Sequence, residues 1–271
     1  MRWSTLEAMS VPLITYAQNR EDLYLFALIG HIENGFYVDV GANHERLHSV
    51  TRLFYERGWS GINIDANPTL IAEFAAERPK DANVNVGVGA TDGKMRFREY
   101  PRHDGLSTFD EAIMKLHEPS GYPYQDRLIP ITTLQKILER EGVRRIDFLK
   151  IDVEGFELEV LKGNDWTRFR PTVVLLEATY GQLAIDQMLA NGYRLEFFDG
   201  LNYYFVEDDA KGVSIHNYSE RILRGNVRTH AELVQADLHE ERLAGRGDLG
   251  IRAHALGLKR AVVQRLRSTW R

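Results

Sequence analysis

The residues of this 271-residue chain with the clearest chemical potential are carboxylates that follow short hydrophobic runs. Asp39, Asp65, Asp152 and Glu177 each end such a run, and Glu154 comes two positions after Asp152. The runs have the apolar and β-branched composition of buried strands. The carboxyl ends of parallel strands meet at one edge of a sheet, where α/β proteins bind their ligands. Acids scattered over a surface would not repeat this position, so we interpret these side chains as parts of one ligand site.

Ahead of Asp65 the chain has the pattern of the first half of a nucleotide-binding α/β fold. Residues 35–43 predict a strand that turns at Gly41, where the missing Cβ allows close approach of backbone to a ligand or a positive φ. Residues 49–57 have the apolar spacing of a helix, and residues 61–65 predict the next strand. An acid at the end of that strand is well placed to accept hydrogen bonds from both hydroxyls of a ribose.

The turn itself distinguishes between nucleotide-containing ligands. A dinucleotide site favours the pattern G-x-G-x-x-G, with an acid roughly 20 residues further on. Here the turn holds Gly41 with Glu45 close behind it, and Asp65 follows Asp39 by 26 residues. Glu45 would repel a diphosphate, whereas an acid before the glycine suits a cationic amino-acid portion, as in S-adenosylmethionine. The alternative interpretation is a nicotinamide-dependent oxidoreductase, which would use the same strand ends.

The elements that must position these acids form five β-α units and a closing antiparallel pair. Helices are expected over residues 23–32, 49–57, 68–77, 134–141, 156–161 and 183–190, with Asn19 as the N-cap of the first. Strands are expected over residues 35–41, 61–65, 83–89, 146–152, 171–177, 193–198 and 202–206, and residues 95–100 are a hairpin partner. The predicted fold is α/β, a mostly parallel sheet covered by helices on both faces.

Two further segments have polar compositions that suit a site. Residues 101–127 form a long, polar, aromatic loop, and a loop of this length in a compact domain is usually functional, so we expect an acceptor-binding lid. Gln18, Asn19 and Asp22 precede or begin the first helix. They either cap that helix or lie over the ligand at the strand ends.

Composition excludes several classes of function. The chain has no cysteine, which excludes disulfides, thiolate chemistry and Cys-ligated zinc. A net charge of −5 argues against nucleic acid as the main partner. The N-terminus lacks the apolar run of a signal peptide, and no apolar stretch is long enough to span a bilayer. The default expectation is a soluble, cytoplasmic protein.

The C-terminal part of the chain differs from the rest. Residues 210–271 are expected to be helical, and residues 251–271 carry six basic residues and no acid. One interpretation is a solvated helix packed on the domain or on a second subunit of a homo-oligomer. The other is a basic amphipathic segment in peripheral contact with an anionic membrane.

Six sequence blocks together resemble the FkbM family of S-adenosylmethionine-dependent O-methyltransferases. They are residues 16–22, 35–43, 58–68, 105–108, 146–155 and 198–202, in order over about residues 14–206. The resemblance implies a Rossmann-like class I methyltransferase fold with a C-terminal antiparallel hairpin. The expected division is a helical lead-in over 1–34, this domain over 35–209, and the helical, basic extension over 210–271. His44 departs from the family, where a small or acidic residue is common.

The resemblance also implies which residues bind the cofactor and what the acceptor is. Asp39, Gly41 and Asn43 would hold the methionine portion of S-adenosylmethionine, and Asp65 its ribose. The remaining expected contacts are Ala66 and Asn67 near the ribose and adenine, Val88 at the adenine edge, and Gln18 under the functional interpretation of its segment. The implied acceptor is a sugar hydroxyl, commonly of a deoxysugar such as rhamnose or fucose, in a glycan, glycolipid or glycosylated metabolite. A non-sugar natural-product hydroxyl is the alternative.

Methyl transfer to a hydroxyl needs an aligned acceptor and a group that accepts its proton. The candidate bases are Asp152 and Glu154 at the strand tip and His103 and His117 in the predicted lid. Asp152, Glu154 and Glu177 could instead chelate a divalent cation such as Mg²⁺, which lowers the pKa of the hydroxyl. Asp152 could also simply pair with Lys150, because side chains two apart on a strand share a face.

Two other classes of function are weighed against this one. A non-catalytic glycan-binding module would use the aromatic loop without needing Asp39 and Asp65. Nucleic-acid methylation is disfavoured by the charge and by residues 152–155, where Asp-Val-Glu-Gly stands in place of Asn-Pro-Pro-Tyr.

Overall fold

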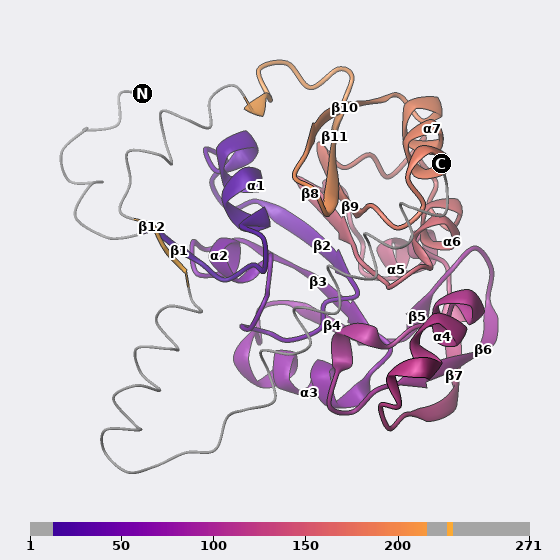
Figure 1. Ribbon diagram of the computed structural model, residues 1–271. Coiled ribbons are helices and arrows are strands. Elements are labelled where there is room, and N and C mark those ends of the chain that lie inside the picture. The colour runs from indigo at the N-terminus through magenta and orange to yellow at the C-terminus, as the bar shows by residue number, and fades with distance from the viewer. Residues whose placement is uncertain (1–12, 216–226, 230–271) are drawn as a thin grey trace, which may run out of the picture.

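The computed structural model describes residues 13–215 and 227–229 (Figure 1). Its centre is a seven-stranded sheet in the order β10-β11-β9-β8-β2-β3-β4. These strands are β2 (Phe36–Val40), β3 (Ser60–Asp65), β4 (Ala82–Asn85), β8 (Phe148–Ile151), β9 (Val173–Glu177), β10 (Tyr193–Phe198) and β11 (Asn202–Glu207). Of the pairings in this sheet, those of β11 are antiparallel and the others are parallel. The predicted α/β class with a mostly parallel sheet is confirmed.

Helices cover both faces of this sheet, and strand alternation shows which side chains face which helices (Figure 1). Val38 and Leu149 pack with α5 (Leu134–Arg140), α6 (Glu157–Lys162) and α7 (Gln182–Ala190). Tyr37 and Phe148 pack on the opposite face with α1 (Glu21–Ile29) and α2 (Arg52–Tyr55). Because alternate strand residues share a face, Asp39 and Lys150 follow Tyr37 and Phe148 toward α1 and α2.

The helix boundaries follow local capping chemistry where the side chains permit it. α3 (Pro68–Glu77) begins as predicted, and the Asn67 side chain accepts a hydrogen bond from the Thr69 N–H. Thr133 caps α5 in the same way through the Lys136 N–H. The expectation for Asn19 was wrong, because α1 begins after Arg20, which has a left-handed backbone and makes no side-chain cap bond. α2 is shorter than the helix predicted over residues 49–57.

A second, three-stranded sheet corrects the prediction for the middle of the chain. The strand expected over residues 83–89 is divided between β4 and β5 (Gly87–Val88), and β5 belongs to the second sheet. There β5 and β6 (Gly93–Glu99) both pair with β7 (Gln125–Thr132), so β6 is not the hairpin partner of the third strand. β7 was not predicted, because most of its residues are exposed and its sequence therefore lacks a hydrophobic run.

The predicted lid contains more regular structure than a loop. Residues 101–127 include η2 (Asp104–Leu106), α4 (Glu111–His117) and η3 (Glu118–Ser120), and β7 begins within them. The Asp110 side chain caps α4 by accepting from the N–H groups of Ala112 and Ile113. Together with β6 and β7 this segment lies beside the central sheet, at the lower right of Figure 1.

The chain ends are described only in part. β1 (Leu13–Thr15) pairs in parallel with β12 (Val227–Thr229), so these three C-terminal residues form a strand where a helix was expected. Residues 216–226 and 230–271, including the basic segment 251–271, lie outside the described residues. Within the described ranges, no helix has the length and apolar character needed to cross a membrane.

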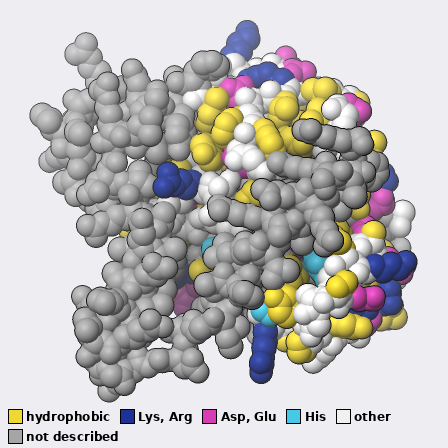
Figure 2. All heavy atoms as spheres, in the orientation of Figure 1, with side chains coloured by type: hydrophobic (Ala, Val, Ile, Leu, Met, Phe, Trp, Pro, Cys, Tyr) yellow, Lys and Arg dark blue, Asp and Glu magenta, His cyan; other side chains and the backbone are white. Residues whose placement is uncertain are grey.

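The surface mixes side chains of all kinds. In Figure 2, Lys and Arg side chains are interspersed with Asp and Glu and with hydrophobic patches over the coloured part of this face. That part of the surface shows no basic stripe of the kind that binds a nucleic-acid backbone.

Candidate functional site

A pocket opens at the carboxyl ends of β2, β3 and β8, and the segment 104–109 forms its other wall. The space inside it that no atom fills is about 650 Å³, a value that includes solvent at its open side. Eight of the residues predicted from the sequence line it: Gly41, Asn43, Asp65, Ala66, Asn67, Val88, Asp152 and Glu154. Chain segments that are far apart in the sequence therefore meet at the carboxyl ends of the strands, as expected.

The glycine turn forms the floor of the pocket because its backbone passes very close to the β8 loop. Gly41 has φ +75°, and a Cβ on it would lie 1.8 Å from the carbonyl oxygen of Asp152. The Gly41 N–H donates to the carbonyl oxygen of Ile64 at 2.9 Å, which ties the turn to β3. Asn43 also has a positive φ of 55°. Only glycine fits the first of these positions.

Asp65 ends β3 with its carboxylate held by backbone amides. Its Oδ2 accepts from the Asn43 N–H at 3.0 Å, and its Oδ1 accepts from the Asn67 N–H at 2.8 Å. Burial raises the pKa of Asp65 to about 6, while these two hydrogen bonds act in the opposite direction. The carboxylate is thus oriented before any ligand binds, with lone pairs left for further donors.

The Asp-Val-Glu-Gly segment after β8 is a tight turn organised by a residue that the sequence analysis missed. Glu157 is buried and accepts from the N–H groups of Val153 and Gly155, both at 3.0 Å. Burial raises the pKa of Glu157 to about 7. Glu154 has φ +53°, a costly conformation for a residue other than glycine. The position of Glu157 at the start of α6 could have indicated this role from the sequence, since an acid in a first helical turn can accept hydrogen bonds from preceding N–H groups.

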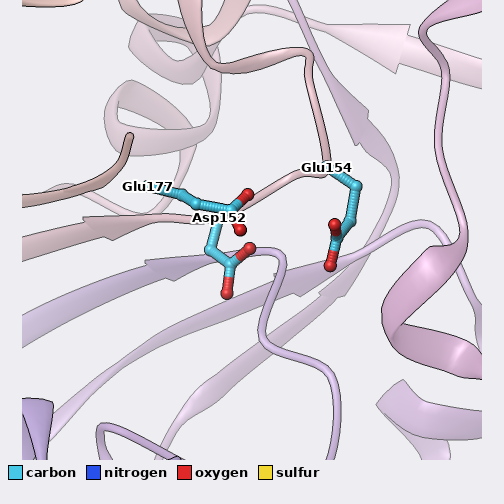
Figure 3. Close-up of side chains that lie close together, drawn as sticks. All are labelled: Asp152, Glu154 and Glu177. Carbon is cyan, nitrogen blue, oxygen red and sulfur yellow. The ribbon is translucent and has the colours of Figure 1, made fainter. Parts of the chain in front are cut away.

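Three acids predicted as a group do come together. Asp152, Glu154 and Glu177 each offer an oxygen, and these oxygens lie within 4.8 Å of one another. Figure 3 shows the carboxylates of Asp152 and Glu154 pointing the same way from the β8 loop, with Glu177 beside Asp152. An all-oxygen donor set of this kind fits a hard divalent cation such as Mg²⁺. Glu177 does not line the pocket itself.

Asp39 lies behind the pocket wall instead of on it. Its side chain is 1% exposed, and its Oδ2 accepts from the Thr51 hydroxyl at 3.1 Å. The Lys150 Nζ lies 3.2 Å from Asp39 Oδ1 and 3.6 Å from Asp152 Oδ2, which confirms that Lys150 pairs with Asp152. Burial raises the pKa of Asp39, and Lys150 opposes that shift. A direct contact between Asp39 and a cofactor is therefore not what the geometry favours.

The candidate histidines and Gln18 are absent from the pocket lining as described. His117 is buried edge-on against Tyr100, and burial lowers the pKa of the His117 imidazole. The His103 ring packs on the Tyr122 ring at 4.0 Å between centroids. The structure does not bring these three residues to the acids that it gathers.

The segment before α1 has a structural role in this fold. Asp22 is fully buried and accepts from the Thr15 hydroxyl at 2.5 Å and from the Tyr16 N–H at 2.7 Å. These bonds hold the chain that enters α1. Asp22 does not line the pocket as described, and its bonds to donors that precede α1 differ from the capping of that helix that was expected.

His44, the departure from the family pattern, links the glycine turn to the far wall. Its Nε2 lies 3.3 Å from Asp104 and its Nδ1 lies 3.5 Å from Glu73 of α3. The hydrogen bond with Asp104 raises the pKa of His44. Because Asp104 lines the pocket, this contact helps to hold the segment 104–107 over the glycine turn.

The charge of the pocket wall has one sign. Asp65, Asp104, Asp152 and Glu154 line it, whereas no Lys, Arg or His is among the described lining residues. Lys150 reaches these acids from behind, with its Nζ 2.5 Å from the carbonyl oxygen of Gly41. Such a wall attracts a cationic ligand and repels a diphosphate.

A family model, described as the methyltransferase FkbM domain, matches residues 39–203, which is more than half of the chain. The chain belongs to the FkbM methyltransferase family. This confirms the resemblance. The matched range begins at Asp39 and ends within β11, so it contains every strand of the central sheet except the start of β2 and the end of β11.

Two solved structures are among those similar to this member of the FkbM family. The methyltransferase FkbM from Methylobacillus flagellatus KT is 16% identical, with a TM-score of 0.41 over 67% of this chain and 47% of that one. The chain thus spans about half the length of this relative. A putative RNA methyltransferase from Pyrococcus horikoshii is 12% identical, with a TM-score of 0.36 over 70% of this chain and 82% of that one. No curated protein matches the chain.

The close approach at the glycine turn yields a stability prediction. Gly41→Ala should lower the free energy of unfolding by about 3 kcal/mol or more, because the new Cβ would meet the Asp152 carbonyl and alanine disfavours φ +75°. Urea denaturation would measure this loss.

Two glycines serve as controls for that measurement. Gly142 has φ +66° with nothing within 4 Å of an added Cβ, so Gly142→Ala isolates the backbone cost, about 1 kcal/mol. Gly93→Ala meets neither obstacle. Equal losses in Gly41→Ala and Gly142→Ala would contradict the role given to the close approach.

Proposed function

We propose that this protein is an S-adenosylmethionine-dependent O-methyltransferase that acts on a sugar hydroxyl. The observation that carries the proposal is the Asp65 carboxylate, oriented by two backbone amides in a pocket whose charged lining residues are all acids. S-adenosylmethionine has a ribose that needs such an acceptor, and it carries a sulfonium and an ammonium that suit such a wall. The sugar acceptor is supported by the family resemblance of the sequence blocks.

The arrangement of the central sheet agrees with a Rossmann-like class I methyltransferase fold. Residues at the ends of the neighbouring parallel strands β2 and β3 form the floor of the pocket, as expected for a ligand site in a parallel sheet. The antiparallel β11 lies between β9 and β10, so the C-terminal hairpin completes the sheet at one edge.

The lining residues divide into parts that suit the parts of this cofactor. Asp65 would accept hydrogen bonds from the ribose hydroxyls, and Asn43 and Gly41 would face the methionine portion. An adenine ring requires apolar surface, and four lining residues offer it: Ala66, Leu70, Val88 and Phe97. When bound, S-adenosylmethionine supplies an electrophilic methyl group on sulfur.

The side chains of Asp152 and Glu154, in the loop after β8, would accept the proton of the acceptor hydroxyl. Transfer of a methyl group to the acceptor oxygen would release the hydroxyl proton, and a carboxylate would accept that proton. Asp152 and Glu154 both line the pocket and can accept it, whereas His103 and His117 do not line it. The segment 104–109 on the opposite wall would orient the sugar ring and exclude water.

The alternatives fit the same pocket less well. A nicotinamide dinucleotide or a nucleic-acid backbone would place phosphates next to four acids with no basic lining residue among those described. A glycan-binding module would leave the oriented Asp65 without a use. A non-sugar hydroxyl as acceptor is compatible with the same chemistry, and it is the second candidate for the substrate.

Isothermal titration with S-adenosylhomocysteine and with NADH tests the proposed class of cofactor. S-adenosylhomocysteine should bind with micromolar affinity or better, and NADH should bind at least about a hundredfold more weakly because of its diphosphate. Tighter binding of NADH would overturn the methyltransferase proposal in favour of an oxidoreductase. Binding of neither ligand would favour the glycan-binding module.

The ionisation of Asp65 predicts how that affinity depends on pH. The folded-state pKa is raised to about 6, so the carboxylate that accepts the ribose hydroxyls is lost as the pH falls through this value. The affinity for S-adenosylhomocysteine should therefore fall as the pH drops below 6 and level off about tenfold lower, once Asp65 is fully protonated. Asp65→Asn should bind about tenfold more weakly at pH 7.5 and lose this dependence. An unchanged slope in the variant would assign it to another group.

The three carboxylates also support a proposal for a divalent cation. We place it at Asp152, Glu154 and Glu177, where it would lower the pKa of the acceptor hydroxyl when bound. Mg²⁺ at millimolar concentration should raise the melting temperature of the wild type and not that of Glu177→Gln. Glu111→Gln, at an exposed acid paired with Arg96, is the matched control and should respond like the wild type. No response in the wild type would assign the acids to proton acceptance alone.

A further inference from the structure

A continuous line of buried side chains leads from the end of α3 to the pocket. Arg78 Nη1 donates to the Thr51 hydroxyl at 2.7 Å, and that hydroxyl donates to Asp39 Oδ2 at 3.1 Å. Lys150 Nζ lies 3.2 Å from Asp39 Oδ1. All four side chains are buried. We call Arg78, Thr51, Asp39 and Lys150 the buried relay; its last member contacts Asp152 and Gly41, which line the pocket.

The chemistry of these groups gives the relay one direction. An arginine can only donate, so the Thr51 oxygen accepts from Arg78, and its single proton is left for Asp39. Arg78 is itself held by the Ser49 hydroxyl at 2.7 Å and by the Glu45 carbonyl, and it stacks over Phe74. The position of the hydroxyl is therefore determined by a guanidinium that has little freedom to move.

The buried positive charge of Lys150 explains why this side chain needs the buried relay to hold it in place. An ammonium buried this deeply needs anionic and carbonyl partners. Lys150 contacts Asp39, Asp152 and the Gly41 carbonyl, and its charge also acts to lower the pKa of Asp65. Asp39 is the one of these acids that does not line the pocket, so it can hold the lysine whether or not a ligand is present.

We propose that Thr51 and Lys150 are positioning residues for the methyl-transfer site. Lys150 joins the glycine turn to Asp152, and Thr51, oriented by Arg78, holds Asp39 and through it Lys150. This inference rests on the proposed function, since it concerns where the cofactor turn and the candidate base lie. Neither residue lines the pocket among those described, and their effect on a ligand is transmitted through Gly41 and Asp152.

The first test measures S-adenosylhomocysteine binding in variants of Thr51. Thr51→Val removes the hydroxyl at nearly constant volume and should weaken binding about tenfold. Thr51→Ser keeps the hydroxyl and should bind within about twofold of the wild type. Lys150→Met should weaken binding at least as much as Thr51→Val, because both the turn and Asp152 lose their shared donor.

Thr15→Val separates positioning from a general loss of stability. Thr15 is as buried as Thr51, and its hydroxyl also donates to a buried aspartate, Asp22, but this pair joins β1 to the first turn of α1 and is away from the pocket lining. Thr15→Val should lower the melting temperature about as much as Thr51→Val and leave binding unchanged. Equal weakening in both variants, or none in Thr51→Val, would overturn the proposal.

A second readout keeps this test independent of the cofactor. Carboxyl carbon NMR of protein labelled at aspartate, with Asp152→Asn to assign the signal, reports the surroundings of Asp152 without a ligand. The Asp152 resonance should move in Thr51→Val and stay in place in Thr51→Ser and Thr15→Val. If the wild type does not bind S-adenosylhomocysteine, the proposed function fails, and this measurement alone decides the relay: an unmoved resonance in Thr51→Val overturns it.

Discussion

The buried ammonium of Lys150 is the interaction on which the rest of the site depends. Parallel strands bring their acids to one edge of the sheet, and without a cation this convergence would be unfavourable. Lys150 Nζ lies 3.2 Å from Asp39 and 3.6 Å from Asp152, and it donates to the Gly41 carbonyl. One charge thus lets β2 and β8 pair side by side while both present acids toward the same end.

Backbone shape is the second constraint, and it explains why the pocket forms between these strands. The turn after β2 and the loop after β8 touch at Gly41 and Asp152, closer than any residue with a Cβ permits. Glu154 then adopts a left-handed conformation, held by Glu157 through two N–H groups and by the Thr108 hydroxyl on its carbonyl. The conformational cost of this turn is consistent with a functional position, since such strain persists where surrounding contacts enforce it.

The second sheet gives the site its other wall. β6 and β7 carry the segment 104–109 to the pocket, and the His44 contact with Asp104 joins this wall to the glycine turn. The acids of the pocket therefore come from both the central sheet and this added unit. That distribution favours a ligand with positive charge at its centre, which is the property that separates S-adenosylmethionine from phosphate-bearing cofactors.

The α/β class, the parallel sheet and eight residues of the pocket lining could be predicted from the sequence, because these depend on local patterns. Hydrophobic runs predict buried strands, and the residue that ends each run must lie at the ligand edge, as Asp65 and Asp152 do. The strand β7 was not predictable in this way, since an exposed strand has no hydrophobic run.

Which acids line the pocket and which lie behind its wall depends on tertiary packing. Asp39 and Asp65 end similar strands, yet Asp39 is enclosed by α2 and paired with Lys150, while Asp65 lines the pocket. The same holds for Arg78 and Thr51, whose hydrogen bonds to Thr51 and to Asp39 join residues at least twelve positions apart in the sequence. Hydrogen bonds and ion pairs between distant residues depend on packing, and a single sequence carries no local signal for them.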